Sequence, residues 1–184
     1  MRALVAYGTT EGQTRKIAET IALQVGGLGH EVDLFDTSGF QRNLHPELFD
    51  IIIVAGSVHE QRHQESVEVF VVANRKKLQA NPTMFVSVSL AAAFDDGMAD
   101  AQGYADSFFD DVDWRPSKTL LVAGAVRHGA YGYYKEQILE HVVLENRELD
   151  DPESDHEFTD WTFLARAIDE FIVAGDLWVV QSQS

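Results

Sequence analysis

The sequence lacks cysteine, and this absence narrows the chemistry open to its 184 residues. Without thiols the chain cannot form disulfides, use cysteine as a nucleophile or bind a metal cluster through sulfur. Long apolar runs are missing as well, because no stretch approaches the roughly 20 residues that a membrane-spanning helix needs. The N-terminus enters an apolar segment directly, so we expect no signal peptide and predict a cytoplasmic protein.

Positive charge is also scarce. The chain has 14 Lys and Arg against 30 Asp and Glu, a formal net charge of −16, and only five of its residues are lysine. Nonspecific nucleic-acid binding needs a basic face and is therefore excluded, and attraction to an anionic membrane is disfavoured. The acids cluster at 95–96, 110–113 and 148–157. We hypothesise a surface adapted to high salt, with an ordinary acidic protein as the alternative.

Apolar segments alternate with helical patterns along most of the chain. We predict strands at 2–7, 31–35, 50–56, 84–90 and 119–126, and helices at 13–27, 63–80, 97–112 and 160–174. Near-continuous apolar strands joined by helices indicate a parallel sheet that is covered on both faces. The predicted fold class is therefore α/β, a flavodoxin-like three-layer sandwich with a five-stranded parallel sheet of order 2-1-3-4-5.

One connection is far longer than the usual few residues. Residues 127–158 lie between the fifth predicted strand and the last predicted helix. We predict a single domain over 1–184, with 127–158 as an insertion or lid before that helix. The apolar residues at 177–180 could dock on the core or on a partner, and the sequence does not decide between the two.

The turn after the first strand carries the most informative pattern. It reads Thr9-Thr10-Glu11-Gly12-Gln13-Thr14 and leads straight into a predicted helix. Hydroxyl and amide groups gathered at the positive end of a helix dipole suit a phosphate. The chain lacks the spacing of both the Walker loop and the dinucleotide-binding glycine motif. The alternative is that Thr9 or Thr10 only caps the helix.

Two further loops are expected to meet this turn, because ligands of open parallel sheets bind beyond the carboxyl ends of the strands. These loops are residues 56–63 and 89–94. A phosphate at the first loop and a flat ring between the other two fit FMN. The predicted cofactor-binding residues are Thr9, Thr10, Glu11, Gly12, Gln13, Thr14, Ser57, Val58, His59, Glu60, Leu90, Ala91, Ala92 and Ala93. We predict no metal site from His59, His63 and His128, since a metal needs three or four ligands in tight geometry.

The chain resembles the flavodoxin-like protoporphyrinogen dehydrogenases, which pass electrons to a quinone. The resemblance runs from about residue 1 to 174 and rests on Gly12-Gln13-Thr14-Arg15, Ile17-Ala18, Phe85-x-Ser87-Val88-x-Leu90, Trp114-Arg115-Pro116, Ala123-Gly124-Ala125-x-Arg127 and Thr159-Asp160-Trp161. It implies FMN, two-electron oxidation of a porphyrinogen in haem biosynthesis, and a quinone or another redox partner as acceptor. It also implies peripheral membrane contact through the insertion, although here the insertion continues with Glu136, Glu140, Glu145 and Glu148.

Arg127 and Tyr131 are the predicted catalytic residues. A guanidinium matches a substrate carboxylate in bidentate fashion, and Tyr131, with Tyr133 and Tyr134, could wall an aromatic substrate. The alternatives are a surface arginine paired with an acid and a tyrosine cluster packed on the core. At the level of the whole protein, the alternatives are a flavodoxin-type electron carrier without substrate chemistry and a flavin-free binding module on the same fold.

The salt hypothesis makes a direct prediction. If the acidic surface is adapted to high salt, the melting temperature should be higher at about 1 M KCl than in dilute buffer, because screening removes self-repulsion among the carboxylates. Thermal melts followed by circular dichroism in both solutions measure the difference. Equal melting temperatures would reject the hypothesis.

Overall fold

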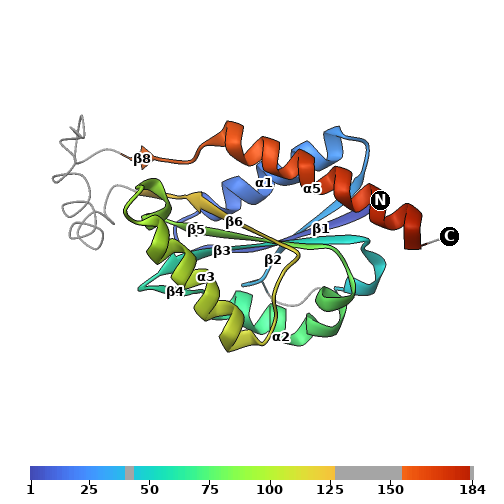
Figure 1. The fold of residues 1–184 in the computed structure, drawn as a ribbon, viewed down its shortest axis with the longest axis horizontal. Coiled ribbons are helices and arrows are strands. Elements are labelled where there is room, and N and C mark those ends of the chain that lie inside the picture. Colours follow the sequence, from blue (N-terminus) through green and yellow to red (C-terminus); the bar gives the residue numbers. More distant parts are fainter. Residues whose placement is uncertain (40–43, 127–154, 183–184) are drawn as a thin grey trace.

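The central layer is a parallel sheet. The structure, a computed structural model, describes residues 1–39, 44–126 and 155–182. Five strands form the main path, β1 (Arg2–Gly8), β2 (Glu31–Asp36), β3 (Ile51–His59), β5 (Thr83–Ser89) and β6 (Lys118–Ala123). Their order is β2-β1-β3-β5-β6, with every neighbouring pair parallel (Figure 1). Counted along the chain without the short β4, this is the predicted order 2-1-3-4-5, which is confirmed.

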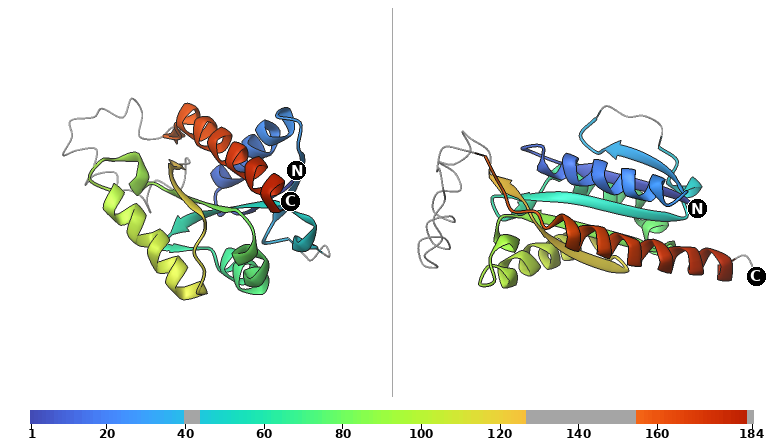
Figure 2. Two further views of the ribbon diagram at one scale, coloured as in Figure 1. Left: turned by 45° about the vertical axis from the view of Figure 1, so that its right-hand side comes forward. Right: turned by 90° about the horizontal axis from the view of Figure 1, so that it is seen from above.

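Helices cover both faces of the sheet. On one face lie α1 (Gln13–Gly27) and α5 (Trp161–Ser182), and on the other lie α2 (Glu65–Ala80) and α3 (Met98–Val112) (Figures 1 and 2). Two short 3-10 turns, η1 (Pro46–Leu48) and η2 (Ala91–Ala93), lie in the connections. The predicted three-layer α/β sandwich is therefore confirmed.

Each central strand contributes side chains to two hydrophobic cores, one on each face of the sheet, because successive side chains of a strand point to opposite faces. In β1, Ala3 and Val5 pack with α1 and α5, whereas Leu4 and Ala6 pack with α2 and α3. All four are fully buried. This double burial explains why the strands read as continuous apolar runs rather than as alternating ones.

The structure adds two short antiparallel pairs. Strand β4 (Arg62–His63) folds back on the end of β3, and β7 (Ala125–Val126) pairs with β8 (His156–Glu157). The second pair joins the two described ends of the chain on either side of 127–154, with Ala125 opposite Glu157.

The last helix is longer than predicted. It begins after Asp160, whose carboxylate accepts the N–H of Phe163 at 2.9 Å and so caps it, and it continues to Ser182. The apolar residues after 176 therefore extend α5 and do not fold back as a separate docking segment. Leu177 stays 61% exposed and Val180 67%. None of the described helices has the length and apolarity to cross a bilayer.

A buried histidine lies in the core between the sheet and α3. His63 is only 5% exposed and packs against the rings of Phe85 and Phe108, with centroid separations of 5.1 and 4.9 Å. Its Nε2 lies 3.1 Å from the Ser87 hydroxyl, while Nδ1 is buried without a hydrogen-bond partner in the described part of the chain. Burial lowers the pKa of His63 to about 4, so the imidazole is neutral in the folded protein.

This histidine should make stability depend on pH. In the unfolded chain the pKa of His63 is near its ordinary value of 6.5, and in the folded protein it is about 4. The contribution of neutral His63 to the free energy of unfolding is therefore fully present above pH 6.5 and is lost as the pH falls toward 4. The loss amounts to about 3 kcal/mol. Urea unfolding of the wild type and of His63→Leu at several pH values between about 7 and 4 measures it. The variant should lose less stability on acidification, and identical pH slopes would contradict the assignment.

Candidate functional site

A cavity opens at the carboxyl edge of the sheet, where β1, β3, β5 and β6 end. Of the predicted cofactor-binding residues, it is lined by Thr9, Thr10, Glu11, Gln13, Thr14, Ser57, Val58, His59 and Leu90. It is also lined by Val88, Ser89, Gly124 and Ala125, which the prediction did not include. The expected convergence of three loops on one point therefore occurs, with the end of β6 as a fourth wall.

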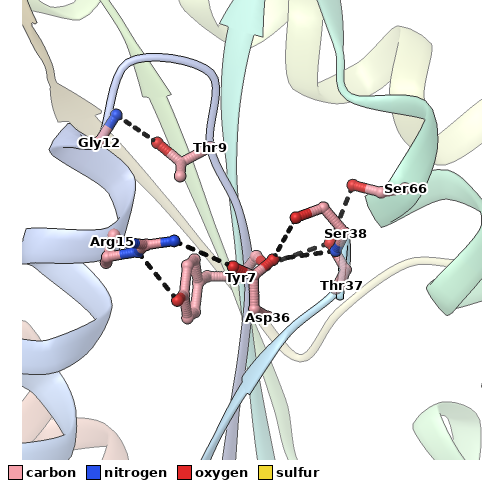
Figure 3. Close-up of polar contacts among 8 residues, drawn as sticks. All are labelled: Tyr7, Thr9, Gly12, Arg15, Asp36, Thr37, Ser38 and Ser66. Atoms are coloured by element: carbon pink, nitrogen blue, oxygen red, sulfur yellow. Dashed lines mark hydrogen bonds and ion pairs between the residues drawn. The ribbon is translucent and has the colours of Figure 1, made fainter. Parts of the chain in front are cut away.

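The first wall is the turn between β1 and α1. Gly12 has a left-handed backbone with φ of 91°, which residues with a side chain rarely adopt, and its N–H donates to the Thr9 hydroxyl at 2.9 Å (Figure 3). The helix begins at the next residue, Gln13. The backbone N–H groups of the first helical turn have no partner within a helix, so this end of α1 carries donors and a positive dipole end.

Thr14 is the clearest sign of a ligand. Thr14 is one of the residues that line the cavity, it is 1% exposed, and its hydroxyl oxygen has no hydrogen-bond partner among the described residues. An unpaired buried hydroxyl costs about 1 to 3 kcal/mol, and proteins rarely keep such groups without a reason. At the start of a helix, an anionic oxygen is the partner that this hydroxyl and the nearby amides favour together.

Contacts outside the cavity hold the same turn from the β2 side. Arg15 donates from Nε to the Tyr7 hydroxyl at 3.1 Å and from a terminal nitrogen to Asp36 at 3.2 Å (Figure 3). Burial raises the pKa of Asp36, but hydrogen bonds from Ser38 and Arg15 outweigh this effect and hold the pKa below its usual range. Arg15 thus pairs with the Asp36 carboxylate and is not among the residues that line the cavity.

Close backbone packing fixes the end of β1 beside this turn. A Cβ added to Gly8 would lie 2.4 Å from a methyl group of Val67 in α2, much closer than atoms can approach. The hydroxyl of Thr37 donates to the Tyr7 carbonyl oxygen at 3.1 Å and lies 2.9 Å from the Ser66 hydroxyl (Figure 3). Only glycine lets β1 and α2 approach this closely.

The second wall comes from β3 and its hairpin with β4. Ser57, Val58 and His59 line the cavity, whereas the predicted Glu60 lies in the turn beyond them. Glu60 and Gln61 have φ values of 50° and 64°, a two-residue turn that normally selects Gly or Asn. The Gln64 side chain donates to the hydroxyls of Ser57 and Thr10, which ties this wall to the first one.

The third wall follows β5. Leu90 lines the cavity, but Ala91, Ala92 and Ala93 form η2 and are not among its lining residues. The N–H of Ala92 donates to the Ser89 hydroxyl at 3.2 Å and that of Ala93 to the Leu90 carbonyl at 2.9 Å. Two residues of the predicted cofactor-binding set therefore use their backbone amides within the loop itself. Contacts of Ala91 to Ala93 with a flavin stay a prediction.

Several predicted residues need separate mention. Arg127 and Tyr131 lie outside the described residues, as do Tyr133, Tyr134 and His128, so the catalytic assignments stay predictions. In the described ranges, no three His, Asp or Glu side chains gather closely enough to hold a metal ion. Gly124 and Ala125 had a sequence signal, since the end of the fifth strand must reach the same edge of the sheet.

The profile of the flavodoxin domain family matches residues 4–153. The chain belongs to the flavodoxin family. The predicted family and fold are thereby confirmed. FMN is the cofactor of flavodoxins, so family membership confirms the predicted cofactor of this chain. One similar solved structure is a mutant flavodoxin from Fusobacterium nucleatum bound to flavin mononucleotide. That structure is 16% identical and has a TM-score of 0.42, with 65% of this chain and 67% of that chain covered.

This flavodoxin-family chain is also similar to named dehydrogenases. Protoporphyrinogen IX dehydrogenase [quinone] of Escherichia coli is 25% identical over 166 residues, which cover 90% of this chain and 91% of the relative. The protein of the same name from Leishmania major is 23% identical over 172 residues, which cover 92% and 74%. Among solved structures, a mutant flavodoxin from Pseudomonas aeruginosa matches with a TM-score of 0.50 and 14% identity over 80% of this chain and 97% of that chain.

Proposed function

We propose that this protein is an FMN-dependent oxidoreductase that oxidises a porphyrinogen-like substrate, protoporphyrinogen IX, and passes the electrons to a quinone or another acceptor. The observation that carries the cofactor part is the buried hydroxyl of Thr14, a cavity-lining residue at the start of α1, which has no hydrogen-bond partner in the part of the chain that the structure describes. Support for the substrate comes from the relatives named protoporphyrinogen IX dehydrogenase, which align with 90% of the chain or more.

The residues of the first wall fit a phosphate. The Thr14 hydroxyl and backbone N–H groups of the first helical turn would donate to it, while Gly12 keeps the backbone open for close approach. The described residues that line the cavity include Glu11 but no lysine or arginine. The phosphate would therefore be held by hydroxyls, amides and the helix dipole rather than by side-chain cations.

The flat ring of FMN would lie between the second and third walls. Ser57 to His59 would lie on one side and Val88 to Leu90 on the other, with Gly124 leaving room at the edge. Bound FMN supplies two-electron oxidation and reduction, so the protein needs to bind and orient the reactants and does not need a catalytic triad. We propose that Arg127 pairs with a substrate carboxylate and that Tyr131 contacts the substrate ring, as the sequence predicts.

An electron carrier is the second candidate. Acidic residues are numerous on and beside α3, where Asp100, Asp110 and Asp111 are all exposed. Flavodoxin-type carriers dock transiently on partners, and an acidic surface steers a basic partner toward it. The carrier and the enzyme share the cofactor site and differ in whether the protein itself turns over a porphyrinogen.

Binding experiments test the phosphate site. We expect Thr14→Val to weaken FMN binding about tenfold and to leave riboflavin binding nearly unchanged, because riboflavin has no phosphate. Quenching of flavin fluorescence on titration measures both affinities. Thr14→Ser is the matched control, since it keeps the hydroxyl.

The same variant should not destabilise the flavin-free protein. Thr14→Val removes an unpaired buried hydroxyl, so urea unfolding without flavin should show unchanged or slightly higher stability. Wild-type FMN affinity in Thr14→Val, or equal losses for FMN and riboflavin, would contradict the assignment of the phosphate site.

Turnover separates the enzyme from the carrier. The protein reconstituted with FMN should oxidise protoporphyrinogen without oxygen when a quinone is supplied, and the increase in porphyrin fluorescence measures the rate. The protein without added FMN is the control for spontaneous oxidation. Tight FMN binding without turnover, across several quinones, would reject the enzyme and favour the carrier.

A further inference from the structure

We propose that Glu157 and Thr159, which lie just before α5, are positioning residues that brace the first turn of α1 and so set the geometry of the phosphate site. This inference rests on the proposed FMN function. Neither residue lines the cavity. Both act through side chains of the first helical turn, and both are more than 140 residues away from that turn in the sequence.

The inner contact of the brace is buried. The Gln13 side chain donates from Nε2 to the Thr159 hydroxyl at 2.9 Å, and this hydroxyl in turn donates to the Ala123 carbonyl oxygen at 2.7 Å. Gln13 is 5% exposed and Thr159 8%. A hydroxyl that accepts from α1 and donates to the end of β6 ties two walls of the cavity together, and buried hydrogen bonds of this kind are costly to break.

The outer contact is an ion pair with a second partner. Lys16 lies 2.5 Å from one carboxylate oxygen of Glu157, and the Trp161 indole N–H donates to the other at 2.7 Å. The Lys16 ammonium also lies 5.0 Å from the centre of the Trp161 ring. These contacts fix the Glu157 side chain between α1 and the start of α5, which lie side by side on one face of the sheet (Figure 2).

The brace contacts the first turn of α1, whose hydrogen-bond donors need a fixed orientation to bind the proposed phosphate. Gln13 and Lys16 flank Thr14 in the first turn, and the Thr14 hydroxyl has no hydrogen-bond partner within 1–39, 44–126 and 155–182. Helix donors bind an anion well only if their direction is fixed before the ligand arrives. Holding Gln13 and Lys16 from the α5 side leaves Thr14 turned to the cavity.

Thr159→Val tests the inner contact with little change in side-chain shape. We expect FMN affinity to fall about tenfold and riboflavin affinity to change less than about twofold, because the change acts on the phosphate end. Thr159→Ser keeps the hydroxyl and should bind FMN within about twofold of the wild type. Flavin fluorescence titration gives all the affinities, and circular dichroism shows whether each variant is folded.

Glu157→Met tests the outer contact, because the brace and simple charge repulsion predict opposite changes in FMN affinity. Removing an acid near an anion site should strengthen FMN binding if only long-range charge matters. The brace instead predicts binding weaker by about threefold or more, with riboflavin little changed. Glu170→Met is the matched control, because Glu170 also pairs with a lysine, Lys118, at 3.1 Å, but lies near the opposite end of the sheet. It should leave FMN affinity unchanged.

The outcomes separate this inference from the proposed function. If the wild type binds FMN but Thr159→Val and Glu157→Met bind it as tightly or more tightly, the brace is overturned and the FMN site stands. Equal losses for FMN and riboflavin would also overturn it, because they indicate damage to the whole cavity. A wild-type protein that binds neither flavin rejects the proposed function, and the brace falls with it. If Thr159→Val does not fold, Glu157→Met and its control decide alone.

Discussion

The left-handed backbone at Gly12 determines where α1 begins, and every group proposed to bind phosphate depends on that starting point. A helix that began one residue earlier or later would rotate the first turn by about 100° and carry the Thr14 hydroxyl away from the cavity. The surrounding contacts reinforce this position. Gly8 lets β1 pack closely on α2, Arg15 holds the turn toward β2, and Gln13 holds it toward α5.

Carboxylates pair with the two basic residues of the first turn of α1, and the described lining of the cavity contains no lysine or arginine. Arg15 pairs with Asp36 and Lys16 with Glu157, so the two basic residues nearest the loop are engaged by carboxylates of the protein itself. An anion at the start of α1 would then meet mainly neutral donors. In a chain with a net charge of −16, such a site relies on short-range geometry and the helix dipole, because the overall charge repels an anion.

The sheet and the bounds of α1 were predictable because local signals agree with the fold. Buried strands read as apolar runs, Gly12 directly precedes the 13–27 helix, and Gly26 and Gly27 are its last two residues. The β4 hairpin was not predictable, because Glu60 and Gln61 occupy turn positions at which Gly or Asn is usual. The use of the Ala92 and Ala93 amides inside η2 and the bond between Gln13 and Thr159 depend on three-dimensional packing, which residue spacing does not encode.

The pairing of β7 with β8 holds together the two described stretches of chain on either side of 127–154, because Ala125 lies opposite Glu157. Once two ends are pinned together, lengthening the loop between them costs only a logarithmic increment of closure entropy. A change in the number of residues between Val126 and His156 should therefore cost little free energy of unfolding and leave the described sheet and the start of α1 in place.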